Sequence, residues 1–204
     1  MKPARLIAVA VPLILVALVL AARMRGANDK DRVVELLGLA PGMTVADVGA
    51  GDGEWALEFA RRVGPTGRVL ATEISASRLD DIRKAATRAS VDNVVAIEAT
   101  DRASGLPEGC CDAIFLRHVY HHLTQPEATL ASLRRALKPE GQMIVVDFEA
   151  RWWSTPEGVH ENRGGHGMPL ELLAKELTRA GFEVVRSIDG WSGTDYLVLV
   201  RRGK

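Results

Sequence analysis

The chain has 204 residues, which is room for one domain of ordinary size. Hydrophobic residues make up 47% and charged residues 25%, a composition typical of folded globular proteins and not of disordered chains. Basic and acidic residues number 26 each, so the net charge is zero and does not predict a nucleic-acid partner. The two cysteines, Cys110 and Cys111, are adjacent, so they cannot link distant segments or supply a zinc cage.

Residues 6–22 form an uncharged apolar run, LIAVAVPLILVALVLAA, with basic residues on both sides. As a helix this run is about 25 Å long, close to the roughly 30 Å hydrocarbon core of a membrane. We therefore predict one transmembrane helix within an N-terminal anchor at 1–26. The alternatives are a signal peptide, which would export the protein, and a buried core helix, but Arg23 and Arg25 interrupt the small-residue cleavage site of a signal peptide. The heavier basic flank after the run favours a cytoplasmic domain.

Beyond this anchor, strand and helix patterns alternate with short connections, which predicts a mostly parallel sheet with helices on both faces. The last two strand segments are joined by residues 189–195, a connection too short for a parallel crossover, so one antiparallel strand is expected near the C-terminal edge. The seven predicted strands are Thr44–Val48, Arg68–Ile74, Val94–Ala99, Asp112–Val119, Gln142–Phe148, Glu183–Ile188 and Tyr196–Val200.

The segment VADVGAGDG at residues 45–53 predicts a strand that runs into a glycine turn and then a helix. Gly49, Gly51 and Gly53 permit a sharp turn and a close approach of a ligand to the backbone. The dinucleotide fingerprint G-x-G-x-x-G requires glycine where this chain has Glu54. Asp47 is a carboxylate within an apolar strand and needs a cationic or hydrogen-bonding partner. This acidic turn suits a ligand with an amino acid moiety better than a pyrophosphate.

Two further acidic residues follow the next strands. Glu73 ends the second strand about twenty residues after Gly53, where a carboxylate can accept hydrogen bonds from both hydroxyls of a ribose. Asp101 follows the third strand and is placed to bind the amino group of an adenine. The glycine turn and these two carboxylates together predict a site for an adenosine that carries an amino acid.

The segments VADVGAGDG, LATEIS, ATD, CDAIFLRHVYHHL and LKPEGQMIVVDF, in this order, resemble the class I S-adenosylmethionine-dependent methyltransferases over roughly residues 33–200. The resemblance implies an α/β, Rossmann-like, doubly wound seven-stranded sheet with an antiparallel last strand, in a methyltransferase domain at 27–204. It implies that the methionine part of the cofactor is surrounded by Asp47, Gly49, Gly51 and Gly53. Glu73 is expected to hold the ribose, Ile74 to pack against the adenine and Asp101 to bind its amino group.

Methyl transfer needs an aligned acceptor, and it needs a base only where the acceptor loses a proton. The histidine cluster after the fourth strand suggests His121 as that base; the alternative is that a histidine there caps the next helix or packs in the wall. Tyr120 is a second catalytic candidate, with lining of the pocket as its alternative. No cysteine or carboxylate near these histidines completes a metal site, so no metal is predicted. His118 stands where the family often has an acidic residue, so no role is carried over to it.

The connection Glu149–Met168 is long for a compact domain, and loops of this length often serve as active-site lids. It contains His166, which is expected to act as a lid residue or as a helix cap, and Trp152 and Trp153, which would form an apolar lid or contact lipid headgroups. An ordinary exposed loop is the alternative interpretation.

These observations predict a membrane-anchored, S-adenosylmethionine-dependent methyltransferase that acts on a small or lipid-like acceptor. One alternative is a catalytically inactive, cofactor-binding regulatory or scaffold protein at the membrane. The other is a nicotinamide oxidoreductase, which the missing glycine at position 54 disfavours. The oligomeric state is not predicted.

Overall fold

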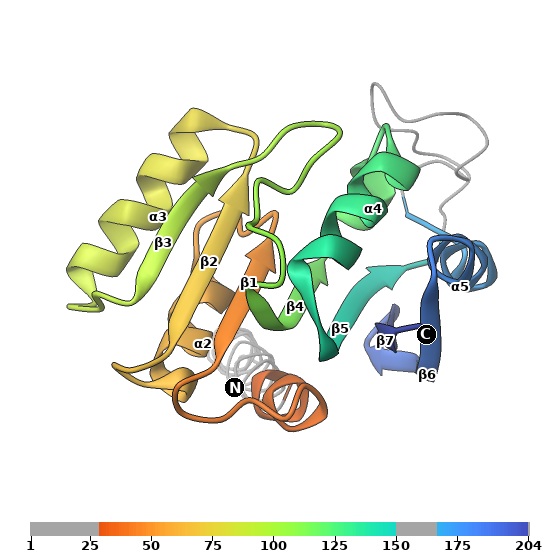
Figure 1. Ribbon diagram of the computed structural model, residues 1–204, viewed down its shortest axis with the longest axis horizontal. Coiled ribbons are helices and arrows are strands. Elements are labelled where there is room, and N and C mark those ends of the chain that lie inside the picture. The colour runs from red at the N-terminus through yellow and green to blue at the C-terminus, as the bar shows by residue number, and fades with distance from the viewer. Residues whose placement is uncertain (1–28, 150–166, 204) are drawn as a thin grey trace, which may run out of the picture.

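A computed structural model of the chain describes residues 29–149 and 167–203 (Figure 1). The apolar run at 6–22 and the connection with Trp152, Trp153 and His166 lie outside the described residues, so the roles expected of them stay predictions. Within the two described ranges, no helix has the length and apolar character needed to cross a membrane.

The described strands form one seven-stranded sheet in the order β3-β2-β1-β4-β5-β7-β6. The pairs among β1 to β5 are parallel, and β7 is antiparallel to both β5 and β6. This confirms the predicted mostly parallel sheet with an antiparallel last strand. The strands are β1 (Thr44–Val48), β2 (Arg68–Glu73), β3 (Val94–Glu98), β4 (Cys111–Arg117), β5 (Leu137–Phe148), β6 (Phe182–Ser192) and β7 (Asp195–Arg202).

Helices cover both faces of the sheet, and alternate residues of each strand face opposite layers. In β4, Ile114 and Leu116 pack in one core with Leu130 of α4 (Pro126–Ala136) and Leu173 of α5 (Leu170–Arg179). The neighbouring β4 residues Ala113 and Phe115 pack in a second core, on the other face, with α2 (Glu54–Val63), α3 (Ala76–Arg88) and the helical residues 29–36. Figure 1 shows α3 beside the β3 edge and α5 beside the β6 edge.

The order of the strands defines where a ligand can bind. The chain proceeds from β1 outward through β2 to β3 and then crosses to β4 on the other side of β1. In sheets of this type, ligands bind outside the carboxyl ends of the strands, at the point where the order reverses. The glycine turn after β1 and the histidine cluster after β4 therefore meet at one edge. That cluster contains the short 3-10 helix η1 (Tyr120–His122).

Candidate functional site

The glycine turn after β1 is built on left-handed backbone conformations. Gly49, Gly51 and Gly53 have φ values of 69°, 59° and 83°, a region that side chains other than Asn and Asp rarely adopt. A Cβ atom on Gly49 would lie 2.2 Å from Cγ2 of Val119, so close packing of the β4–η1 loop also excludes a side chain there. A Cβ atom on Gly51 would meet nothing within 4 Å, which leaves room for a ligand beside the turn.

Glu73 ties this turn to the end of β2. Its Oε1 accepts a hydrogen bond of 2.8 Å from the N–H of Gly51, and its Oε2 accepts one of 3.1 Å from the N–H of Ile74. The hydrogen bond to Gly51 links the end of β2 to the glycine turn after β1, and the expected role of Glu73 toward a ribose stays a prediction. The two hydrogen bonds hold the carboxylate at the mouth of the turn, where it can also bind hydroxyl groups of a ligand.

A pocket of about 360 Å³ opens next to Glu73, between the ends of β1, β2 and β3 and the β4–η1 loop. Four of the residues predicted to hold the cofactor line it, namely Gly49, Glu73, Ile74 and Asp101. Ile74 is 69% exposed, so a large apolar side chain is available at the pocket to pack against a flat ring. The carbonyl oxygen of Asp101 accepts a hydrogen bond of 3.2 Å from Oγ1 of Thr129, which holds the Asp101 loop against α4.

Asp47 lies behind the turn, only 3% exposed, at the penultimate residue of β1. Within the described residues, its Oδ2 atom has no hydrogen-bond partner. Burial raises the pKa of Asp47 to about 7; the N–H of Ala56 opposes this increase, while the charges of Glu73 and Asp52 add to it. A buried carboxylate oxygen in this state is suited to a cation, such as the ammonium group of an amino acid.

His121, the predicted base, forms a buried pair with Asp147 at the end of β5. Its Nδ1 lies 2.8 Å from Oδ1 of Asp147, and its backbone N–H donates to Oδ2 at 3.1 Å. The side chains of His121 and Asp147 are 1% and 0% exposed. This geometry favours a positioning role, in which the pair holds η1 against β5, and the role of His121 as a base stays a prediction.

Tyr120 lies on the core side of η1. Its ring is fully buried in the core with α4 and α5, and its hydroxyl donates a hydrogen bond of 2.7 Å to Oε2 of Glu176 in α5. The structure thus places Tyr120 between η1 and α5 and not among the residues of the 360 Å³ pocket. Packing accounts for the contacts of Tyr120, a role that was not predicted for it, and its expected catalytic role stays a prediction.

His118 and Asp195 form a second pair that the sequence did not predict. Nε2 of His118 lies 2.8 Å from Oδ2 of Asp195, and the His118 side chain is about one-third exposed. Asp195 is 77 residues away in the sequence and begins β7, the one strand that runs opposite to β5. The short connection at 189–195 predicts the direction of β7, but it assigns Asp195 to the connection and does not show that this carboxylate reaches the end of β4.

A smaller cleft of about 190 Å³ lies beside this pair, on the face covered by α2. It is bordered by the helical residues 29–36, the first turn of α2, and the ends of β4, β5 and β6. Its lining combines aromatic walls with charged groups and consists of Asp29, Lys30, Glu54, Trp55, Arg117, Val146, Trp191, Ser192 and Asp195.

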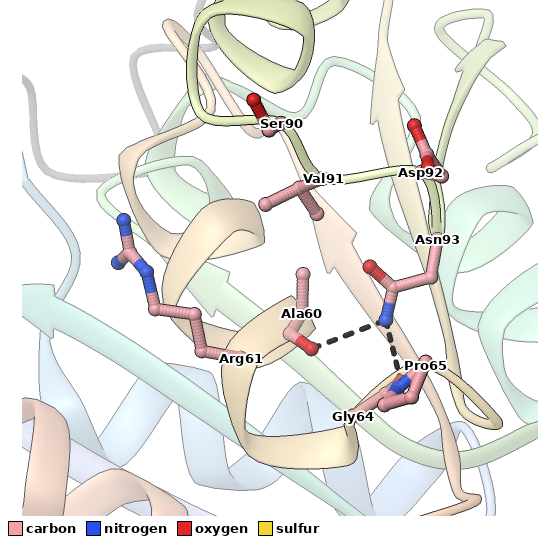
Figure 2. A pocket seen from close by; sticks show the side chains of 8 residues that line it. All are labelled: Ala60, Arg61, Gly64, Pro65, Ser90, Val91, Asp92 and Asn93. Carbon is pink, nitrogen blue, oxygen red and sulfur yellow. Dashed lines mark hydrogen bonds between the residues drawn. The ribbon is translucent and has the colours of Figure 1, made fainter.

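Another pocket, of about 440 Å³, lies at the opposite edge of the sheet, where Asn93 precedes β3 (Figure 2). The Nδ2 group of Asn93 donates hydrogen bonds to the carbonyl oxygens of Ala60 and Gly64, at 3.1 and 2.8 Å. These bonds satisfy the carbonyl groups at the C-terminal end of α2, so they serve the fold. In the described parts of the chain, no group of three His, Cys, Asp or Glu side chains is placed to hold a metal ion.

The sheet order, the left-handed glycine turn and the acidic residue that ends β2 together define a class I S-adenosylmethionine-dependent methyltransferase fold and site. The chain belongs to a methyltransferase domain family, whose model matches residues 20–187. The family and the fold identify this domain as an S-adenosylmethionine-dependent methyltransferase domain and imply S-adenosylmethionine as its cofactor.

Among similar proteins is the ubiquinone/menaquinone biosynthesis C-methyltransferase UbiE of Shewanella pealeana, 34% identical over 120 residues that cover 58% of this chain and 48% of that protein. UbiE of Erwinia tasmaniensis is 29% identical over 150 residues, which cover 72% of this chain and 60% of that protein. The chain spans about half the length of the curated relatives it matches.

Solved structures confirm the fold. A methyltransferase dependent on S-adenosylmethionine from Aquifex aeolicus aligns with a TM-score of 0.71 and 26% identity, covering 84% of this chain and 88% of that one. The cyclase SpnF aligns with a TM-score of 0.70 at 18% identity, covering 85% of this chain and 80% of SpnF. Because that similarity concerns the fold alone, function has to be argued from the site.

Proposed function

We propose that this methyltransferase methylates a ring carbon of an aromatic, quinone-like acceptor at a membrane surface. The observation that carries the proposal is the similarity to UbiE C-methyltransferases, named for ubiquinone and menaquinone biosynthesis. Two features of this chain support it. The cleft of about 190 Å³ has aromatic walls, Trp55 and Trp191, and the apolar run at 6–22 would hold the enzyme where lipid-like acceptors reside.

The residues of the site fit S-adenosylmethionine. The buried Oδ2 of Asp47 is suited to the ammonium group, and the Glu73 carboxylate to the ribose hydroxyls. Exposed Ile74 offers an apolar surface to the adenine, and Asp101 lies on the same pocket to accept a hydrogen bond from its amino group. When bound, S-adenosylmethionine supplies an electrophilic methyl group on a sulfonium.

The residues of this chain align the acceptor with the cofactor and take up the proton that the acceptor loses. The acceptor ring carbon gains the methyl group and loses its hydrogen as a proton, while the sulfonium becomes a neutral thioether. A phenolic hydroxyl makes the ring carbon more nucleophilic once it has lost its proton, so a base near the acceptor accelerates transfer. The Glu73–Gly51 hydrogen bond holds the glycine turn after β1, and the His121–Asp147 pair holds η1 against β5. In this proposal the cofactor and the acceptor meet between these two segments.

The proposal is tested with the full chain in mild detergent, deuterated S-adenosylmethionine, and prenylated benzoquinols and naphthoquinols that lack a ring methyl group. Mass spectrometry should find one labelled methyl group on a ring carbon and one equivalent of S-adenosylhomocysteine. The oxidised quinones are the matched control and should not react, because they carry no hydroxyl to ionise. Cofactor binding without methylation of any quinol would overturn the proposed acceptor.

The membrane position, with the domain on the cytoplasmic side, is tested separately. A full-length variant with Leu15→Arg and Leu18→Arg places two charges in the apolar run, which should move the protein from the membrane fraction to the supernatant. Protease added outside right-side-out vesicles should leave the wild-type domain intact. Unchanged membrane association of the variant, or digestion from outside, would contradict this part of the proposal.

A further inference from the structure

We propose that His118, held by Asp195, accepts the hydroxyl proton of the acceptor, an inference that rests on the aromatic acceptor proposed above. The pair lies where three strands meet at the carboxyl edge of the sheet. His118 directly follows β4, Phe148 ends β5 and Asp195 begins β7. In the ladder between β5 and β7, Phe148 lies opposite Asp195, so the fold itself fixes the carboxylate next to the end of β4.

The backbone at His118 is in an unusual conformation. Its φ of 54° is left-handed, and among the described residues other than glycine only Ser90 shares this property. Such a conformation costs a non-glycine residue about 1–2 kcal/mol, and strained residues of this kind cluster at functional sites. Here the conformation is held by the N–H of His118, which donates a hydrogen bond of 2.9 Å to the carbonyl oxygen of Val146.

The imidazole ring of His118 is oriented from two sides. Nε2 lies 2.8 Å from Oδ2 of Asp195, and the ring meets Phe148 edge to face at 5.3 Å between centroids. With a hydrogen on Nε2 donated to Asp195, the second ring nitrogen, Nδ1, carries the lone pair and is the basic atom. Because the side chain is about one-third exposed, it can meet a ligand, whereas His121 is buried.

The neighbouring cleft indicates which chemistry His118 meets. Trp55 and Val146 provide apolar walls for an aromatic ring, and Arg117 provides a cation for an oxygen that becomes negative, whereas Lys30 is paired with Glu54. Arg117 also lies 4.0 Å from Asp195, so one carboxylate connects the cleft to the His118 ring. The apolar walls suit the flat ring of a phenol or a quinol, and the Arg117 cation suits its ionised oxygen. The charged groups that line this cleft are Asp195 and Arg117 from the strands, Asp29 and Lys30 from the helical residues 29–36, and Glu54 from α2.

The proton transfer balances without a further reactant. The O–H bond of the acceptor breaks, the proton forms an N–H bond at Nδ1 of His118, and the electron pair stays on the oxygen as a phenolate. The imidazolium that results is stabilised by the carboxylate of Asp195, and the phenolate by Arg117. Asp195 is a positioning residue in this scheme, because it acts through the His118 ring.

The test compares His118→Asn and Asp195→Asn with the wild type, using the quinol assay from pH 6 to 10. Asn tolerates the left-handed region, so His118→Asn preserves the backbone. We expect His118→Asn to lower kcat about 100-fold at pH 7, with less loss near pH 10, where a phenol ionises unaided. S-adenosylhomocysteine affinity should stay within about twofold in calorimetry.

Asp195→Asn should lower kcat less, and Asp80→Asn, which alters an exposed ion pair on α3, should change nothing. A wild-type kcat for His118→Asn, or an equal loss at every pH, would overturn the proposal.

A spectroscopic probe separates this proposal from the proposed function. Bound 4-nitrophenol should ionise in the wild type at a lower pH than in free solution, as its absorbance reports, and this difference should disappear in His118→Asn. If no quinol is methylated but the probe behaves as expected, the proposed function fails and the assignment of His118 stands. If quinols are methylated and 4-nitrophenol fails to bind or ionises equally in the variant, the assignment of His118 fails.

Discussion

Replacing Asp47 with Asn should stabilise the cofactor-free protein above neutral pH and at the same time weaken its binding of S-adenosylmethionine. Burial raises the pKa of Asp47 from 3.8 to about 7, so the folded state holds the proton more tightly than the unfolded chain does. The stabilisation that comes from this tighter proton binding is present in full below pH 3.8 and is lost as the pH rises to about 7.

The size of the effect follows from the two pKa values. A tenfold change in proton affinity corresponds to about 1.4 kcal/mol, so the difference between 3.8 and about 7 amounts to about 4 kcal/mol. Asn is neutral at every pH, and its amide oxygen can still accept the hydrogen bond from the N–H of Ala56. Asp47→Asn should therefore match the wild type near pH 4 and exceed its free energy of unfolding by up to about 4 kcal/mol at pH 8.

Cofactor binding should change in the opposite direction. An ammonium group beside Asp47 favours the ionised carboxylate, so binding below pH 7 releases a proton from the wild type. The Kd of the wild type should fall by up to about tenfold for each pH unit between pH 5 and 7, whereas the variant should bind weakly with no such dependence. Calorimetry in buffers of different ionisation enthalpy counts the released proton.

Chemical denaturation of the cofactor-free full chain at pH 4 to 8 measures the stability. The matched control is Asp112→Asn, at the opposite edge of the sheet. Burial would raise the pKa of Asp112, but hydrogen bonds from Lys138 and from the N–H of Thr44 outweigh it and lower this pKa. The control should therefore be destabilised at neutral pH. An Asp47→Asn variant that is no more stable than the wild type at pH 8 would refute the reasoning.

Three further predictions concern the same edge of the sheet. Glu73→Ala removes the acceptor for the N–H groups of Gly51 and Ile74 and should raise the Kd for S-adenosylmethionine about 10- to 100-fold in calorimetry; an unchanged Kd would contradict its role. Gly49→Ala should lower the free energy of unfolding by about 2–4 kcal/mol, because the strain of the left-handed backbone and the clash with Val119 add together. Gly51→Ala, which meets no clash, should lower it by about 1 kcal/mol and should also weaken cofactor binding. Equal stability of the two glycine variants in urea would refute this distinction. Asp147→Ala removes the acceptor of two backbone N–H groups and of the His121 ring and should lower the free energy of unfolding by about 3 kcal/mol. A decrease below about 1 kcal/mol would show that the His121–Asp147 pair does not hold η1.

The strands could be predicted closely because buried parallel strands are short apolar runs between turn residues. The segment Thr44–Val48 was predicted with the bounds it has in the structure, whereas β5 begins at Leu137 and not at Gln142. Pro139 and Gly141 are typical of a turn, yet this stretch extends the strand, and Leu137 pairs with Cys111 after a register shift. A Cβ atom on Gly141 would lie 2.6 Å from Cδ1 of Leu137, so this glycine serves close packing within the strand.

The cofactor side of the site was predictable for a different reason. Gly51 and Glu73 meet because consecutive parallel strands end at the same edge, and a spacing of 22 residues accommodates one helix and the next strand. Tyr120 shows the limit of such reasoning, since a polar ring next to two histidines suggests chemistry, whereas its hydroxyl donates a hydrogen bond to the partly buried Glu176 of α5. Whether a side chain on a three-residue helix faces the core or the pocket is decided by tertiary packing.

The pairing of His118 with Asp195 depends on β7, the one described strand that runs opposite to the others. Each parallel strand contributes its last residues to the site, but antiparallel β7 contributes its first, Asp195, which the tight turn after Ser192 places opposite Phe148. From the sequence alone, a carboxylate at the start of a strand is expected to be an ordinary surface residue. Its partner His118 stands where the family often has an acidic residue. In this chain the carboxylate at this place is Asp195, which begins β7, and the imidazole is His118, which follows β4. An enzyme arranged in this way can take a proton from its acceptor with a neutral base that a fixed negative charge orients.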